Sequence, residues 1–128
     1  NFNIYSNGEG KMDCKNEFIA IYNEHIKREG ADKMLEYLLK SDFFTAPAST
    51  RFHLSCEGGL CTHSINVYKF LSDYMKRPRV KEVYGLDYSE ESIAIVSLLH
   101  DVCKVNCYAQ SFRKLQGKYS SNICKGML

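Results

Sequence analysis

Several features are missing from this sequence, and each absence narrows what the protein can be. No segment approaches the uninterrupted apolar run of about 20 residues that a membrane-spanning helix requires. The first residues lack the basic start and apolar middle of a secretory signal peptide. Internal repeats and low-complexity tracts are absent too. With 128 residues, we therefore expect a cytoplasmic protein without membrane association, folded as one domain over 1–128.

Acidic residues are missing from the end of the chain. Residues 102–128 carry five basic and no acidic side chains, whereas 1–50 carry six basic and eight acidic and 51–101 carry six and seven. A basic end could contact phosphate or nucleic acid. Five scattered charges favour a solvated segment instead, and the nine tyrosines show no pattern suited to base stacking. We expect a flexible start (1–12) and a poorly defined basic tail (110–128).

Six cysteines need an explanation: Cys14, Cys56, Cys61, Cys103, Cys107 and Cys124. Without an export signal, we expect reduced thiols and no disulfide framework. One alternative is a structural zinc site built from Cys56, Cys61, Cys103 and Cys107. The spacings C-x4-C and C-x3-C differ from the C-x2-C pairs of most zinc knuckles, so the pattern favours packing of thiols in the core.

Apolar residues at helical spacing predict an all-α protein, with no convincing alternating strand. A first helix is expected over 16–29, and Gly30 stops it. A second, short helix presents these apolar residues on one face: Met34, Leu35, Leu38 and Leu39. The helical pattern breaks around Pro47, and residues 41–61 are expected to form a loop in which Gly58 and Gly59 are the strongest turn signal.

Two further helices carry histidines on their apolar stripes. One is expected from about Leu60 to Lys76; Pro78 ends it, and a polar connection follows. Its stripe consists of His63, Val67, Phe70, Leu71 and Tyr74. The other begins after Ser89, a suitable N-cap, and its stripe consists of Ile93, Val96 and His100. The side chains of both histidines should therefore project from the buried faces of two helices that are adjacent in sequence.

The segment IAIVSLLHDVCK, residues 93–104, ends an apolar helix on an imidazole and a carboxylate. Burying a carboxylate costs free energy unless a nearby cation or several hydrogen-bond donors compensate its charge. If the two helices pack face to face, His63, His100 and Asp101 converge, and a divalent metal prefers such N and O ligands. A metal there would activate water, and Lys104 could hold a phosphate. The alternative is a pair of histidines satisfied within the core.

Three segments together resemble the HD-domain superfamily of metal-dependent phosphohydrolases. They are STRFH, EGGLCTHSINVYKFL and IAIVSLLHDVCK, with FFTAPAST ahead of them, and they span roughly residues 43 to 108. The arrangement is similar to a bacterial and phage group with a GGL-x-x-HS-x-x-V motif followed by LLHD-x-x-K. The joint occurrence of these motifs, in order and at the family's spacing, is far more specific than any one of them.

This resemblance implies an all-helical, HD-like bundle that hydrolyses phosphate esters with one or two divalent metal ions, such as Mn, Mg, Fe, Ni or Zn. The implied metal ligands are His63, His100 and Asp101. The implied catalytic residues are Lys104, Arg51 and His53, the last two near a second metal or the phosphate. The implied partner is a small phosphorylated substrate, in particular a nucleotide, cleaved by metal-activated water.

One part of the family pattern is missing, because the family's last aspartate lies downstream and this chain has no acid after Asp101. The chain could be truncated, or a trimmed fragment, or an upstream acid (Glu57, Asp73 or Asp87) could substitute. Three ligands plus water can still form an open catalytic site. The alternative function is a catalytically inactive HD-like module that binds a nucleotide or a protein partner. An incomplete bundle would expose apolar helix faces, so a homo-oligomer is also expected.

Overall fold

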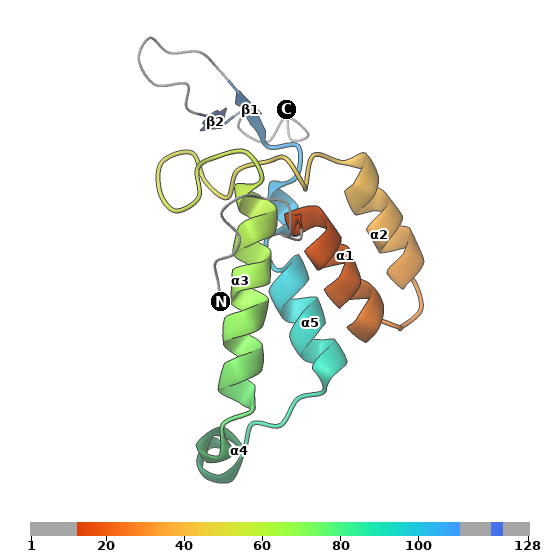
Figure 1. Cartoon of the computed structure of the whole chain (residues 1–128), viewed down its shortest axis with the longest axis vertical. Coiled ribbons are helices and arrows are strands. Elements are labelled where there is room, and N and C mark those ends of the chain that lie inside the picture. Colours follow the sequence, from red (N-terminus) through yellow and green to blue (C-terminus); the bar gives the residue numbers. More distant parts are fainter. Residues whose placement is uncertain (1–12, 111–118, 122–128) are drawn as a thin grey trace.

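The computed structural model describes residues 13–110 and 119–121 of the chain. The predicted flexible start, and most of the predicted basic tail, lie outside these residues. Within them, the elements are α1 (Cys14–His25), α2 (Ala31–Lys40), α3 (Gly59–Met75), α4 (Pro78–Tyr84) and α5 (Glu90–Leu99), then a 3-10 turn (Val102–Lys104), β1 (Tyr108–Gln110) and β2 (Tyr119–Ser121). The predicted all-α helical bundle is confirmed (Figure 1). The short antiparallel pairing of β1 with β2 was not predicted.

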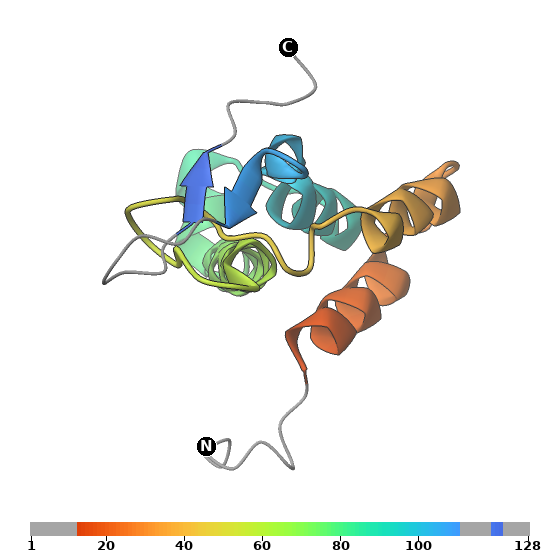
Figure 2. The ribbon, with the colours of Figure 1, turned by 90° about the horizontal axis from the view of Figure 1, so that it is seen from above.

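Three helices, α1, α3 and α5, pack against one another around the core, and α2 lies beside α1 (Figure 1). Figure 2 shows α3 end-on, with the segment between α2 and α3 passing over its end. The buried cluster consists of Phe18, Tyr22, Ile26, Leu38, Phe43, Ala46, Leu60, Cys61, Ile65, Ala94 and Leu98. The three phenylalanines at its α1 side, Phe18, Phe43 and Phe44, pack with ring centroids 5.0 to 5.4 Å apart.

The first helix ends four residues earlier than its apolar spacing predicts. Ile26 is already extended, and the backbone N–H groups of Lys27 and Arg28 donate to Glu91 Oε2 at 2.8 and 2.9 Å. These bonds connect the end of α1 to the first turn of α5. The Glu91 carboxylate thus accepts hydrogen bonds from two amides that would donate to backbone carbonyls if α1 continued for another turn.

The predicted bounds of α3 are confirmed to within one residue, but its buried stripe is not the one expected. Phe70 is 69% exposed, whereas the buried positions are Gly59, Leu60, Cys61, Ser64, Ile65 and Ser72. The buried face is therefore rotated from the predicted stripe by about one residue, or roughly 100°. The small side chains of Ser64 and Ser97 are both fully buried, and they allow α3 and α5 to approach closely.

The same correction applies to α5. The predicted N-cap is confirmed, since Ser89 Oγ accepts a hydrogen bond of 3.0 Å from the backbone N–H of Ser92. Of the predicted stripe, Ile93 is buried but Val96 is 59% exposed. The buried residues of α5 are Ile93, Ala94, Ser97 and Leu98. Both histidines consequently lie at the edges of the packed faces, where solvent reaches them.

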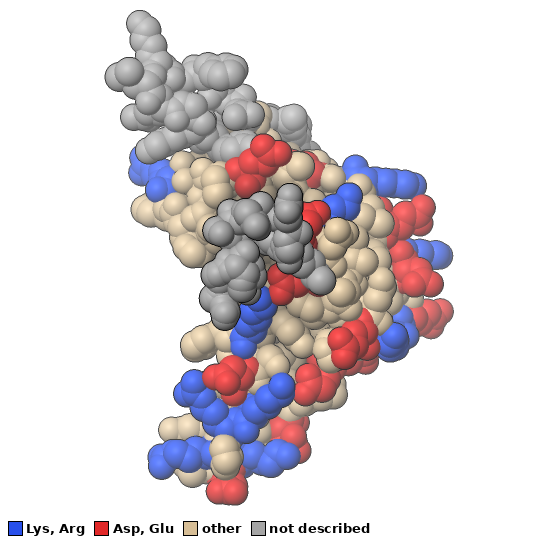
Figure 3. All heavy atoms as spheres, in the orientation of Figure 1, with Lys and Arg blue, Asp and Glu red and all other residues tan. Residues whose placement is uncertain are grey.

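The polar connection expected after Pro78 contains the short helix α4. Pro78 starts this helix at its first position, where the missing N–H costs nothing, and Gly85 ends it at φ 69°. Basic side chains gather over α4 at the lower end of Figure 3. Two of these basic side chains form ion pairs, Arg77 with Asp73 at 3.1 Å and Lys81 with Asp87 at 3.4 Å. None of the helices in the described residues is long and apolar enough to cross a bilayer.

Candidate metal centre

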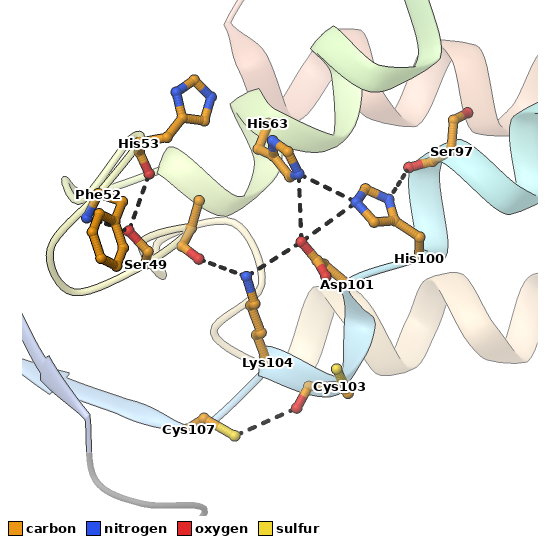
Figure 4. A network of polar contacts seen from close by, with 11 residues as sticks. Ser49, Phe52, His53, His63, Ser97, His100, Asp101, Cys103, Lys104 and Cys107 are labelled. Carbon is orange, nitrogen blue, oxygen red and sulfur yellow. Dashed lines mark hydrogen bonds and ion pairs between the residues drawn. The ribbon is translucent and has the colours of Figure 1, made fainter. Parts of the chain in front are cut away.

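Two helices and the turn after the second one bring three predicted ligands together. His63 comes from the second turn of α3, His100 caps the C-terminus of α5, and Asp101 follows it. Their side chains converge (Figure 4), with His63 Nε2 lying 3.2 Å from His100 Nε2 and 3.5 Å from Asp101 Oδ2. His100 Nε2 lies 3.4 Å from the same carboxylate oxygen. In the described part of the chain, this is the one group of His, Cys, Asp and Glu residues suited to hold a metal ion.

The end of α5 explains how His100 is oriented. The last carbonyl groups of a helix have no partner within it. His100 Nδ1 lies 2.8 Å from one of them, the carbonyl oxygen of Ser97, and donates its proton to it. Neutral His100 then carries its lone pair on Nε2, which faces His63 and Asp101. A hydrogen bond from the far ring nitrogen to a backbone carbonyl is the usual second contact of a metal-binding histidine.

The electrostatics of the group favour the neutral form of His63. Burial, and next the nearby His100, lower the pKa of His63, although Asp101 acts in the opposite direction. A neutral imidazole is the form that binds metals. The side chains are 25% exposed at His63, 32% at His100 and 19% at Asp101. The three side chains are thus partly buried, and solvent still reaches each of them.

Lys104 connects this group to the segment ahead of α3. Its Nζ lies 3.4 Å from Asp101 Oδ2 and donates a hydrogen bond of 2.8 Å to the carbonyl oxygen of Ala48 (Figure 4). The ammonium therefore neutralises part of the carboxylate charge and holds the 48–54 loop against the site. Its predicted contact with a phosphate stays a prediction.

The 48–54 loop carries two further predicted residues, and one of them, His53, lies near the group. The ring of His53 lies 5.6 Å from that of His63, centroid to centroid, and Arg51 is exposed on the same loop. Ser49 Oγ holds the turn by accepting from Phe52 N at 2.9 Å and donating to His53 O at 3.2 Å. His53 is thus at the site's edge, and the catalytic roles of both residues stay predictions.

The alternative ligands considered from the sequence do not join this group. Glu57, Asp73 and Asp87 lie outside it, so none of them replaces the absent downstream acid. The four-cysteine zinc site is also wrong for the described residues, since Cys61 is buried beside Cys14 and Cys107 Sγ donates to the Cys103 carbonyl.

The sequence analysis did not predict two contacts that support the site, although a local feature of the sequence could have indicated one of them. Ser97 lies three residues before His100, so its carbonyl is within reach of any residue that caps this helix. The Ala48 carbonyl had no such signal, because it meets Lys104 across 56 residues of sequence. Only the packing of the loop on α3 brings these two residues together.

Comparison with known proteins gives one partial likeness. The chain is 36% identical over 77 residues to the dihydroneopterin 2′,3′-cyclic phosphate phosphodiesterase of Methanocaldococcus jannaschii. The matched stretch makes up 58% of this chain and 28% of that enzyme, so the chain spans less than a third of its relative's length. No model of a protein family matches the chain, and no solved structure does.

Proposed function

We propose that this protein is a metal-dependent phosphohydrolase, in which His63, His100 and Asp101 hold a divalent cation beside a small phosphate ester. The observation that carries the proposal is the set of distances between the three donor atoms, 3.2 to 3.5 Å. Ligands at about 2.0 to 2.2 Å from one shared ion lie roughly 2.8 to 3.6 Å apart in octahedral or tetrahedral arrangements. The residues therefore fit a metal without rearrangement.

A bound divalent cation supplies a Lewis acid that makes water a better nucleophile near neutral pH and neutralises charge on a phosphoryl oxygen. The chain's own residues prepare the site for it. Ser97 fixes the tautomer of His100, and burial keeps His63 neutral. Lys104 holds the Asp101 carboxylate in place through its contact at 3.4 Å. We therefore assign Lys104 as a positioning residue, with Arg51 and His53 available to a substrate phosphate from the loop.

The relative supports the choice of substrate class. It is a phosphodiesterase that acts on a cyclic phosphate. A nucleotide-like cyclic phosphodiester is therefore the first substrate class to test, followed by acyclic nucleotides. The phosphate would enter from the solvent-exposed edge of the site, where the rings of His63 and His53 meet.

A second candidate is a module that binds metal and nucleotide without turnover. It is favoured by the single carboxylate in the group, since the described residues offer no second acid there. Metal content cannot separate the two functions, because a bound ion need not catalyse a reaction. Hydrolysis that disappears with a metal ligand does separate them.

The test combines elemental analysis with an activity screen on the same samples. Protein stripped with a chelator is reloaded with Mn, Ni or Zn and assayed with nucleoside 2′,3′-cyclic phosphates and nucleotides. We expect about one ion per chain, hydrolysis of at least one ester, and loss of both in His100→Ala. His25→Gln is the matched control, because this histidine contacts Tyr68 at 3.1 Å, outside the metal group. Metal without hydrolysis would support the binding module, and absence of metal would overturn both proposals.

A further inference from the structure

Two cysteines that are distant in sequence meet at the edge of the core, and neither belongs to the group of His63, His100 and Asp101. Cys14 is the first residue of α1, and Cys61 lies in the first turn of α3, 47 residues later. Their Sγ atoms are 3.0 Å apart. A disulfide requires about 2.05 Å, so the two sulfur atoms would need to approach by only about 1 Å.

The two thiols differ in access and in acidity. Cys61 is 1% exposed, whereas Cys14 is half-buried at the end of its helix. The hydrogen-bonding contact between Cys14 and Cys61 lowers the pKa of Cys14 to about 7; Thr62 also lowers it, whereas burial, Glu17 and Asp13 act in the opposite direction. A solvent-accessible thiol in contact with a buried second thiol is the usual arrangement of a redox-sensitive pair.

From the distance between the two sulfur atoms and their unequal access, we propose that Cys14 and Cys61 are a site of reversible oxidation, at which hydrogen peroxide converts them to a disulfide. This inference is independent of the proposed hydrolase activity, since neither thiol belongs to the metal group.

The reaction balances in two steps. The Cys14 thiolate attacks one peroxide oxygen, the O–O bond breaks, and the leaving hydroxide takes up a proton to become water, which leaves Cys14 as a sulfenic acid. The Cys61 sulfur then attacks the Cys14 sulfur, the S–O bond breaks, and the departing hydroxide takes the Cys61 proton as a second water. In total, two thiols are oxidised and one peroxide is reduced.

The cross-link would join the start of α1 to the start of α3. It would close a loop that contains all of α2 and the 48–54 loop, which packs on α3. Closing a long loop restricts the unfolded chain more than the folded one. We therefore expect the oxidised protein to melt at a temperature about 5 °C or more above that of the reduced protein, and a reducing agent to reverse this rise.

The experiment uses the full chain, reduced, desalted and then treated with hydrogen peroxide under native conditions. Free thiols are blocked with N-ethylmaleimide, and peptides are mapped by mass spectrometry without reduction. We expect a peptide pair joined through Cys14 and Cys61 within one chain, which mixing with isotope-labelled protein verifies. The cross-link should persist in Cys103→Ser, a matched change at an exposed thiol, and be absent in Cys14→Ser.

Three results would overturn the proposal, and none of them requires a variant to fold. The first is peroxide-treated wild-type protein in which both cysteines are still alkylated. The second is over-oxidation of Cys14 to a sulfinic acid while Cys61 stays free. The third is a cross-link that joins two chains, or that forms only after a denaturant is added.

Discussion

The Nε2 atoms of His63 and His100 lie 3.2 Å apart, although 37 residues separate the two histidines. Because Nδ1 of His100 donates to Ser97, neutral His100 presents a lone pair at this contact. Nε2 of His63 either donates a proton to this lone pair or, with a cation bound between the two rings, presents a lone pair of its own. Asp101 Oδ2 is within 3.5 Å of both nitrogens and adds a negative charge. The three donor atoms therefore lie within reach of one shared point, and the proposed metal site rests on this arrangement.

The first prediction concerns the charge of Asp101. Asp101→Asn keeps the shape of the side chain and removes the negative charge, so we expect metal affinity to fall at least about tenfold. Isothermal titration with Mn²⁺ or Zn²⁺ measures the change. Asp73→Asn is the control, because Asp73 forms an exposed ion pair with Arg77, four residues later and beyond the end of α3. Equal affinities in the two variants would show that Asp101 does not hold the ion.

The second prediction concerns Lys104. Lys104→Met keeps the aliphatic stem but loses the hydrogen bond to the Ala48 carbonyl and the contact with Asp101. We expect the free energy of unfolding to fall by about 1 kcal/mol and backbone amides of the 48–54 loop to exchange hydrogen faster. Activity should fall while metal binding is retained.

Lys69→Met provides the control for this change. Lys69 makes a single exposed ion pair with Glu17 at 2.9 Å, and such pairs contribute little to stability. Hydrogen exchange of the loop should be unchanged in this variant. If the loop exchanges at the wild-type rate in Lys104→Met as well, Lys104 does not anchor it.

The sequence predicted the helical class and most helix bounds because these depend on local signals, whereas the meeting of the three site residues was expected only if two helices pack face to face. Apolar spacing located α2 and α3, and Ser89 was identified as the cap of α5. The His-Asp pair and His63 stood at the ends of two apolar patterns. These signals act within a few residues, so one sequence is enough to read them.

What the sequence could not supply were the contacts that form only after packing. The rotation of α3 depends on how closely Ser64 lets it approach α5, and spacing alone misplaced Phe70 on the buried side. The early end of α1 depends on Glu91, which is more than 60 residues away. Likewise, the contact between Cys14 and Cys61 has no local pattern.

The third prediction is a pH dependence that arises from Glu91. Hydrogen bonds from the Lys27 amide and then from Arg28 lower the pKa of this carboxyl below its usual value in the folded chain. The unfolded chain therefore binds the proton more readily. The stabilising contribution is fully present above the ordinary pKa of a glutamate, near 4.5, and is lost as pH falls through the lower, folded value.

Glu91→Gln tests this pH dependence. Thermal melts from pH 7 to pH 3 should show the wild type losing part of its stability advantage over the variant as pH falls below about 4.5. Glu82→Gln, a change at an exposed residue of α4, is the control. The difference in melting temperature between this variant and the wild type should not change with pH. A constant gap between wild type and Glu91→Gln at all pH values would contradict the role of the charged carboxylate.

The fourth prediction concerns the contact of Gly59 with the loop that Lys104 holds. A Cβ at Gly59 would lie 2.0 Å from the carbonyl oxygen of Leu54 and 3.1 Å from the Ala48 nitrogen, both backbone atoms. Alanine normally favours a helix over glycine by about 1 kcal/mol. In Gly59→Ala, however, we expect the free energy of unfolding, measured with urea, to fall by about 2 to 4 kcal/mol because the backbone of the loop must move. Gly85→Ala is the control: its Cβ meets nothing within 4 Å, and only its φ of 69° opposes the change, at about 1 kcal/mol. A Gly59→Ala protein as stable as wild type would mean that the loop does not pack on α3 in this way.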